Sequence, residues 1–566
     1  MGDINSHQFD AIVIGSGISG GWAAKELCEH GLKTLVLERG RSVVHVKDYP
    51  TATKHPWEFA HRGRIPLEIA KENPIAGRCY AFQEDTAHFF VKDKEHPYIQ
   101  EKPFDWIRGY QVGGKSLIWA RETQRWSRYE FEAPLRDGFA VDWPIRYEDI
   151  APWYSYVEHF VGISGNKDGI ENLPDGEFLP PWEMNNVELE LKKKIETDYP
   201  GRRMVTGRCA HLTQPREVHL QQGRGQCQAR NLCSRGCPYG GYFSSNSSTL
   251  PWAEKTGNLT LRPDSVVHSI IYNEKSGKAS GVRVIDAHTM KATEYFAKVI
   301  FVNAACLNTN LILLNSISNR FPQGLGNDSG VLGKYIAFHN YRGFINATID
   351  GFADSYYYGR RPSNPLMPSF RNVQKQETDF LRGYMTFLGA GRSEWYDQPE
   401  SKSIGGDYKD SLSEPGGWMI YMSMQGETIP KASNHVRLSS GKKDAWGIPQ
   451  LITSVGYDEN DEKIIKDFLT QGAEMLDKAG CKNIVQRDSK QAPGLDIHEI
   501  GGVRMGKDPK TSLLNKWNQI HNCPNVFVTD GACMTSTGNQ NPSITFMAIT
   551  ARAANHAVEE LKKLNL

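Results

Sequence analysis

Three cysteines are crowded into one glycine-rich stretch, QGRGQCQARNLCSRGCPYGG. Cys227, Cys233 and Cys237 follow a Cys-x5-Cys-x3-Cys-Pro spacing, which lets three thiolates converge on one centre from a turn-forming loop. Arginines before and between them would lower the pKa of the thiols and offset their negative charge. Three interpretations remain open: a structural zinc with His211 or His219 as fourth ligand, a disulfide with one free thiol, or an iron–sulfur cluster.

Two residues in the C-terminal part of the chain also have side chains suited to chemistry. His498 lies in DIHEIGGVRMG, and its imidazole, with an ordinary pKa of about 6.5, suits a general base at neutral pH. Asn541 precedes Pro542 in GNQNPSIT, which is typical of an N-cap followed by proline at the first helical position. The sequence therefore predicts a helix over 542–563, whose positive end would favour a cofactor ring that becomes anionic on reduction. On these residues alone, His498 is equally a structural histidine and Asn541 equally a simple cap.

A scaffold must position these groups, and its centre is predicted in the stretch 10–40. A short apolar run enters a tight turn with Gly15, Gly17 and Gly20, a helical run follows, and a second apolar strand ends in Glu38. The first glycine makes the turn, the second lets the backbone approach a pyrophosphate, and the third lets the helix lie close to the strand. Glu38 is placed to accept hydrogen bonds from a ribose hydroxyl, which favours FAD or NAD over NADP.

A second glycine-containing stretch, RGYQVGGKSLIWAR, begins at Arg108. Gly113 and Gly114 permit a backbone approach that no side chain would allow. Ser116 follows at the start of a short helix. Taken by itself, the stretch is a loop-to-helix junction.

Further apolar and β-forming runs predict the other strands of the first sheet. A buried strand at 298–305 leads into a helix at 307–314 and returns the chain to the sheet begun at residue 11. The β-forming runs before it predict a strand and hairpin insert at 259–261, 266–272 and 282–285.

With 566 residues, the chain is too long for a single hydrophobic core and should form two large domains. Its composition changes after residue 338, where an aromatic-rich section precedes an amphipathic helix at 461–479. Some of these aromatic residues would stack on sugar rings or lie in the core: Tyr356, Tyr357, Tyr358, Trp395 and Tyr396. The predicted domains are a first domain from 1–165, 240–338 and 494–566, a connecting region with the cysteines at 166–239, and a second domain at 339–493.

The composition excludes several classes of protein. Hydrophobic residues make up 39% and charged residues 23%, and 66 basic against 65 acidic residues give no bias toward polyanions, so we expect no nucleic-acid partner. No run of 18 apolar residues occurs, so no membrane span is expected. The start, MGDINSHQFD, lacks the basic and apolar regions of a signal peptide.

The ordered set of motifs resembles the glucose-methanol-choline (GMC) oxidoreductase family. The set comprises the glycine turn with Glu38, the GGKS stretch, HEIGGVRMG, and DG followed by NQNPSIT. It covers most of the first domain, whereas the second domain matches only in position and length. The resemblance implies an α/β fold with a Rossmann-like FAD-binding domain and an α+β substrate domain with an antiparallel sheet, as in p-hydroxybenzoate hydroxylase.

The resemblance also implies roles for single residues in passing a hydride from an alcohol carbon to flavin N5. His498 matches the histidine that takes the hydroxyl proton, and Asn541 matches the residue that hydrogen-bonds the same oxygen. Asp530 matches an acid that contacts the flavin, and the strand backbone at Val266 or Val267 passes the adenine. The predicted cofactor-binding residues are Gly15, Gly17, Gly20, Glu38, Gly113, Gly114, Ser116, Val267, Asp530, Gly531, Asn541 and Pro542. Relatives with covalent FAD carry a histidine in GGxSxHW where this chain has Ile118, so non-covalent FAD is expected.

The cysteine spacing is similar to that of bacterial GMC sugar dehydrogenases, including glucoside 3-dehydrogenases, which carry a three-iron four-sulfur cluster on three cysteines. Such a one-electron relay implies a dehydrogenase that passes electrons to a protein acceptor of the cytochrome c type. Similar enzymes pair with a small subunit that bears the export signal. This implies a periplasmic enzyme exported through its partner, or otherwise a cytoplasmic one.

The sequence therefore predicts an FAD- and iron–sulfur-dependent dehydrogenase that oxidises a secondary hydroxyl of a sugar or glycoside, at C3 of a pyranose. Alternatives of the same class oxidise another sugar position, a polyol or an aldonic acid. Further alternatives are an oxygen-using oxidase with a zinc-stabilised cysteine loop and a non-enzymatic flavoprotein that serves assembly.

Overall fold

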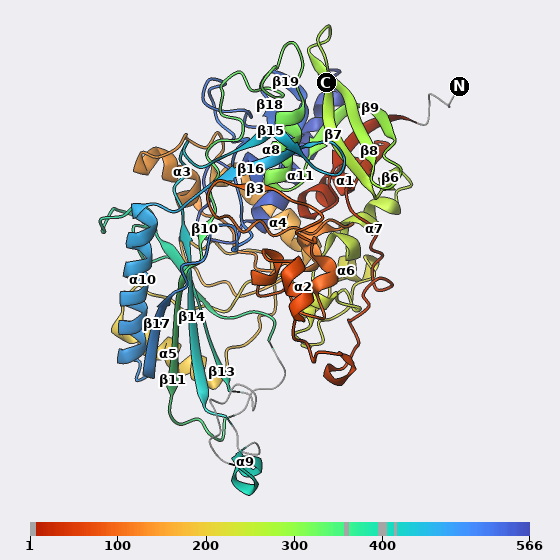
Figure 1. Cartoon of the computed structure of the whole chain (residues 1–566). Helices are drawn as coiled ribbons and strands as arrows, with labels where there is room; N and C mark the ends of the chain where they lie inside the picture. The colour runs from red at the N-terminus through yellow and green to blue at the C-terminus, as the bar shows by residue number, and fades with distance from the viewer. Residues whose placement is uncertain (1–6, 356–360, 394–403, 412–415) are drawn as a thin grey trace.

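The computed structural model describes residues 7–355, 361–393, 404–411 and 416–566. Within these ranges two large β-sheets dominate the molecule, and helices cover their faces (Figure 1). The five aromatic residues proposed to stack on sugars at 356–358 and 395–396 lie outside the described residues.

The first sheet is built around β1 (Gln8–Ile14), which pairs in parallel with β2 and β9. All four residues of β2, TLVL, are buried, as expected for a parallel strand covered on both faces. In the described part of the chain this sheet has eight strands, with β18-β19-β9-β1-β2-β6 in order and β7 and β8 continuing from β9. The strands are β2 (Thr34–Leu37), β6 (Leu259–Arg262), β7 (Ser265–Asn273), β8 (Lys278–Asp286), β9 (Ala292–Val302), β18 (Gln519–Ile520) and β19 (Cys523–Val528).

Two helices that pack against each other connect this sheet to the site. Helix α1 (Ile18–Glu29) follows β1 directly and packs on α11 (Ser543–Lys562). The predicted strand at 298–305 and helix at 307–314 are confirmed as β9 and α8 (Cys306–Asn315), and the predicted hairpin is β7 with β8. The Rossmann-like first sheet is therefore confirmed.

The second sheet is antiparallel and six-stranded within the described residues, with the order β12-β13-β14-β11-β17 and β10 paired to β14. Helix α10 (Glu459–Lys478) lies along it (Figure 1), and α5 (Asn186–Asp198) adds apolar side chains to the same core. This confirms the predicted antiparallel sheet, whereas the domain boundaries stay a prediction. The strands are β10 (His339–Asn340), β11 (Gly343–Ile349), β12 (Leu366–Met367), β13 (Tyr384–Arg392), β14 (Trp418–Glu427) and β17 (Lys482–Asp488).

Shorter elements complete the described chain. The helices are α2 (Leu67–Glu72), α3 (Arg128–Asp137), α4 (Tyr147–Val161), α6 (Glu217–Gln221), α7 (Thr249–Glu254) and α9 (Gly406–Ser411). The strands are β3 (Ile99–Gln100), β4 (Ile163–Ser164), β5 (Phe178–Leu179), β15 (His435–Lys443) and β16 (Pro449–Ser454). Among the helices described, none combines the length and the apolarity needed to cross a membrane.

Candidate active site

A cavity of about 320 Å³ runs from the turn after β1 to residues of the second sheet, a volume typical of ligand sites, which span roughly 300–1,000 Å³. Most of the predicted site residues line it: Gly15, Gly17, Glu38, Gly114, Ser116, Val267, His498, Asp530, Gly531 and Asn541. The remaining predicted residues lie outside its lining: Gly20, Gly113, Pro542 and the three cysteines.

Glu38 closes one end of the cavity and is held by main-chain and side-chain donors. Ser16 donates to Glu38 Oε2 through its Oγ (2.5 Å) and its N–H (3.2 Å), and the N–H of Gly40 donates to Oε1 (2.9 Å). Burial raises the pKa of this carboxyl group, and these hydrogen bonds oppose the rise. A carboxylate offers about four acceptor positions, so one remains for a ribose hydroxyl.

Gly20 and Gly113 do not line the cavity, but they lie where two chain segments beside it pack closely. A Cβ on Gly20 would lie 1.9 Å from the carbonyl oxygen of Gly15, and one on Gly113 would lie 1.6 Å from Asn246 Oδ1. The N–H of Gly113 also donates to Ser16 Oγ (3.0 Å). The two glycine stretches therefore require the absence of side chains in order to pack together.

The start of α1 fits the pyrophosphate of a dinucleotide. Gly17, its N-cap, lines the cavity, and no atom of the described residues lies within 4 Å of where its Cβ would be. No described side chain caps this end of the helix, so its first N–H groups and positive dipole are free for phosphate oxygens. These residues fit FAD.

At the other end of the cavity, His498 lies among three polar groups. Its Nδ1 is 2.8 Å from His339 Nδ1, and its Nε2 is 3.4 Å from the Asn541 amide nitrogen. Asp496 Oδ2 accepts the backbone N–H of His339 (2.8 Å) and of His498 (3.3 Å). The carboxylate therefore joins the loop of His498 to strand β10.

Both histidines are neutral near pH 7. Burial, with smaller contributions from His339 and Lys115, lowers the pKa of His498 well below its usual value. Burial lowers the pKa of His339 to about 4, and burial raises the pKa of the Asp496 carboxyl group to about 7. A neutral imidazole at His498 is able to accept a proton.

Asn541 serves the cavity and does not cap a helix. Helix α11 begins at Ser543, and its N-cap is Pro542, without a side-chain cap in the described chain. The prediction of Asn541 as N-cap was therefore wrong by one residue. The physical reason is that its amide is already engaged: Gln425 Nε2 donates to Asn541 Oδ1 (3.2 Å) and to the carbonyl of Asn539 (2.9 Å).

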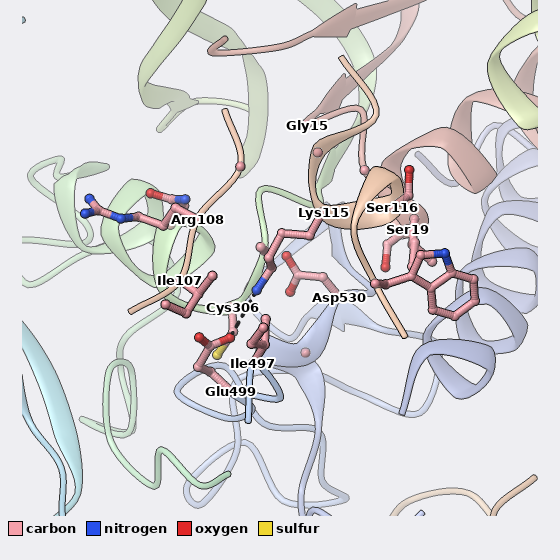
Figure 2. A pocket seen from close by; sticks show the side chains of 18 of the residues that line it. Gly15, Ser19, Ile107, Arg108, Lys115, Ser116, Cys306, Ile497, Glu499 and Asp530 are labelled. Atoms are coloured by element: carbon pink, nitrogen blue, oxygen red, sulfur yellow. Dashed lines mark hydrogen bonds and ion pairs between the residues drawn. The ribbon is translucent and has the colours of Figure 1, made fainter. Parts of the chain in front are cut away.

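Sequence reasoning missed an ion pair in the cavity. Lys115 Nζ lies 3.4 Å from Glu499 Oε2, and Figure 2 shows the lysine pointing toward Glu499 beside Asp530. Asp530 accepts from Thr309 Oγ1 (2.6 Å), and burial raises its pKa to about 6. Both missed residues lie within motifs already singled out, Lys115 inside GGKS and Glu499 directly after His498. Their positions in these motifs could have identified Lys115 and Glu499 as site residues.

The part of the cavity near the second sheet is lined by aromatic rings that no motif marks. Tyr80, Tyr341 and Phe387 line it together with Gln425. The Tyr341 hydroxyl lies 3.1 Å from Ser423 Oγ. Tyr80 is 66% exposed, so its ring is available to a ligand. Apolar ring faces beside polar groups suit a molecule with both C–H faces and hydroxyl groups.

All ten cysteines are free thiols in the structure. Cys233 Sγ lies 3.5 Å from Nε2 of the buried His211. His219 is unavailable as a ligand, because its Nδ1 accepts from the N–H of Arg216 (2.9 Å) and its Nε2 bonds the carbonyl of His159 (3.1 Å). The structure therefore does not contain the disulfide that the sequence left open, and of the two proposed histidines His211 is the one seen near a thiol.

Within the part of the chain that the structure describes, the three cysteines do not form a group whose ligand atoms all lie within 4.8 Å of one another. A tetrahedral zinc with Zn–S bonds of about 2.3 Å places its sulfur ligands roughly 3.8 Å apart. Among the described residues, the only group of three or more histidine, cysteine or carboxylate ligand atoms all within 4.8 Å of one another is His339, Asp496 and His498.

The cysteine loop shares a wall with the cavity. The 3₁₀ turn Cys233–Arg235 contacts the 3₁₀ turn Gly114–Leu117, which carries cavity-lining residues. Tyr242 strengthens this wall, because its hydroxyl donates to the carbonyl of Leu117 (2.7 Å). The loop therefore lies directly behind one face of the proposed flavin site.

A glycine turn with a buried acid, a long cavity and a neutral histidine at its far end define a dinucleotide-dependent oxidoreductase. Two family profiles described as GMC oxidoreductase match residues 9–339 and 430–550. The chain belongs to the GMC oxidoreductase family, a family of FAD-binding enzymes, and the predicted membership is confirmed.

Known proteins resemble the chain over nearly its whole length. It is 28% identical to the 2-methyl-1,2-propanediol dehydrogenase of Mycolicibacterium austroafricanum, over 98% of this chain and 95% of the relative. It is 24% identical to the fructose dehydrogenase large subunit of Gluconobacter japonicus, over 98% of both. The structure of Aspergillus oryzae formate oxidase matches with a TM-score of 0.59 at 13% identity, over 98% of this chain and 99% of that one. The last comparison supports the fold alone.

Proposed function

We propose that the protein is an FAD-dependent dehydrogenase that oxidises a secondary hydroxyl of a sugar or glycoside, at C3 of a pyranose, to a ketone. The observation that carries this proposal is the neutral imidazole of His498 beside the Asn541 amide at the end of the cavity. Bound FAD supplies the acceptor for the hydride. Ile118 stands where a covalent attachment would need a nucleophile, so we propose non-covalent FAD.

The residues of the chain would act on the substrate hydroxyl as a pair. The hydroxyl donates its proton to His498 Nε2, and its oxygen accepts from the Asn541 amide. Removal of this proton raises the electron density at the carbinol carbon and favours departure of the hydride as the carbonyl forms. Gln425 holds the amide, so that the carbon–hydrogen bond keeps one direction.

The choice of a sugar rests on the cavity and on the relatives. Tyr80, Tyr341 and Phe387 offer apolar ring faces, and Gln425 and Asn541 offer polar groups beside them. One relative is a fructose dehydrogenase subunit, and another acts on a small diol, as their names state. The C3 position rests on the sequence resemblance to glucoside 3-dehydrogenases.

We further propose that Cys227, Cys233 and Cys237 hold a three-iron four-sulfur cluster that carries electrons to a cytochrome c-type acceptor. Support comes from the free thiols and from the wall shared with the cavity. A relative named as a large subunit supports a partner subunit. We propose that this partner carries the export signal and places the enzyme in the periplasm; without it the enzyme stays in the cytoplasm.

Anaerobic titration with a panel of glycosides, polyols and aldonic acids tests the substrate. The expected result is bleaching of the flavin band by glycosides, with the new carbonyl at C3 by product analysis. Bleaching by another compound class would select the corresponding alternative dehydrogenase. Rapid turnover with oxygen would select the oxidase, and failure of every alcohol would favour a flavin-binding assembly subunit.

A cysteine variant tests the electron route. Cys233→Ser should remove a broad brown absorption and bound iron but keep the flavin band. Cys209→Ser is the matched control, because Cys209 is buried nearby but lies outside the predicted ligand spacing. Stoichiometric zinc without iron in the wild-type protein would refute the cluster.

A further inference from the structure

A continuous set of hydrogen bonds runs from the backbone to the end of the cavity. His339 Nε2 lies 3.0 Å from the carbonyl oxygen of Gly538, and His339 Nδ1 lies 2.8 Å from His498 Nδ1. His498 Nε2 then faces the Asn541 amide nitrogen at 3.4 Å. Since both imidazoles are neutral near pH 7, each carries a single N–H.

These contacts determine where the hydrogen atoms are. A carbonyl oxygen only accepts, so His339 carries its N–H on Nε2 and its Nδ1 is an acceptor. The short contact between the two Nδ1 atoms then requires His498 to donate from Nδ1, which leaves a lone pair on His498 Nε2. The reverse assignment would leave the Gly538 carbonyl without this donor, which is unfavourable for a buried group.

Neighbouring groups fix the orientation of Asn541 and of His339, the two side chains on either side of His498. Asn541 Oδ1 accepts from Gln425, so its amide nitrogen is the atom that faces His498. His339 is 1% exposed, and Asp496 accepts its backbone N–H. The two imidazole rings are nearly perpendicular, at 85°, and meet through their Nδ1 atoms.

We propose that His339 is a positioning residue that selects the Nδ1–H tautomer of His498 and thereby presents the Nε2 lone pair to the reacting hydroxyl. This inference rests on the proposed function, in which His498 removes the hydroxyl proton. His339 itself lies behind His498 and is not among the residues that line the cavity. On the sequence alone, His339 could be a substrate contact or equally a core or loop residue.

Two amide variants separate the two nitrogens of His339. In His339→Asn, Oδ1 takes the place of Nδ1 and still accepts from His498, whereas the bond to Gly538 is lost. In His339→Gln, the terminal amide takes the place of Nε2 and keeps the bond to Gly538, whereas His498 loses its acceptor. Both variants bury an amide, so a purely structural role predicts similar losses.

The expected result is a limiting rate of anaerobic flavin reduction about 100-fold lower in His339→Gln and within about 10-fold of wild type in His339→Asn. The larger loss stays inside the roughly 10²–10⁴-fold range of a general base. An equal loss in both variants, or a larger loss in His339→Asn, would overturn the proposal.

A second readout does not depend on turnover. Long-range ¹H–¹⁵N spectra of histidine-labelled holoprotein, with the His498 signals assigned through His498→Asn, report the tautomer directly. We expect the Nδ1–H form in wild type and His339→Asn, and a tautomer mixture in His339→Gln. An Nε2–H form in wild type would refute the inference. If the spectra agree but no alcohol reduces the flavin, the proposed function fails while the tautomer assignment stands.

Discussion

Replacing Asn541 by aspartate tests whether a neutral His498 is the base. The Asn541 amide nitrogen lies 3.4 Å from His498 Nε2, and Asn541 is 5% exposed. Asn541→Asp keeps the size of the side chain and places a carboxylate at this distance. A carboxylate favours the protonated imidazole, so the pKa of His498 should rise from its present low value.

The size of the effect follows from the distance. Two unit charges 3.4 Å apart interact by about 5 kcal/mol at an effective dielectric constant of about 20. This energy corresponds to a rise of about three to four units in the pKa of His498. The histidine and the new carboxyl group then titrate as a pair, and the pair should lose its proton at a higher pH than His498 does in the wild type.

The assay is the limiting rate of anaerobic flavin reduction between about pH 5 and 10. In the wild type His498 is already neutral at pH 7, so any change of rate near this pH should follow Asp496, whose pKa is about 7. Asn541→Asp should add a second rise of the rate, at the pH where the pair loses its proton. Asn541→Ala is the uncharged control and should lower the rate without moving the profile. Parallel profiles for the two variants would refute the assignment of His498 as the base.

Three further results are expected. His498→Ala should slow flavin reduction by about 10²–10⁴-fold while FAD stays bound, and an unchanged rate would exclude it as the base. In Glu38→Gln the amide group replaces the carboxylate, so some buried N–H and O–H donors lose their acceptor, at a cost of about 1–3 kcal/mol. Fluorescence titration should therefore show FAD binding about 5- to 150-fold weaker. Equal affinity would contradict the ribose site. The pKa of His339 is about 4 in the folded protein, below its unfolded value of about 6.5. Its contribution of about 3 kcal/mol is therefore complete above pH 6.5 and lost as pH falls toward 4, so the wild type should lose more of its urea unfolding free energy over this range than His339→Asn does.

The first sheet could be predicted well because its signals are local. The glycine turn, the apolar runs and Glu38 lie within about thirty residues of one another, and each position has a single physical requirement. The antiparallel second sheet was predicted from the resemblance, because its strands carry no motif of their own. The helix start at Ser543 was missed by one residue, because an Asn-Pro pair predicts a cap whenever the asparagine has no stronger partner.

The far end of the cavity could be predicted only in part. His498 and Asn541 lie in motifs, but their partners His339 and Gln425 come from other strands. Their local sequence left a substrate contact and a core or loop role equally open. Such contacts depend on pairings between residues more than 100 positions apart, which no local pattern encodes. The ring of Tyr80 was missed for the same reason, since it comes from a section without sustained periodicity.

The proposed base and its supports belong to different sheets. His339 and Gln425 are on strands β10 and β14 of the second sheet, whereas Asn541 lies two residues before the start of α11, which packs beside the first. A small separation of the two halves would break the bonds among these four side chains while every strand and helix stayed intact. On warming, the turnover rate should therefore fall at a lower temperature than the one at which the circular dichroism signal changes. A reagent that cross-links the two halves should protect the turnover rate more than it protects secondary structure.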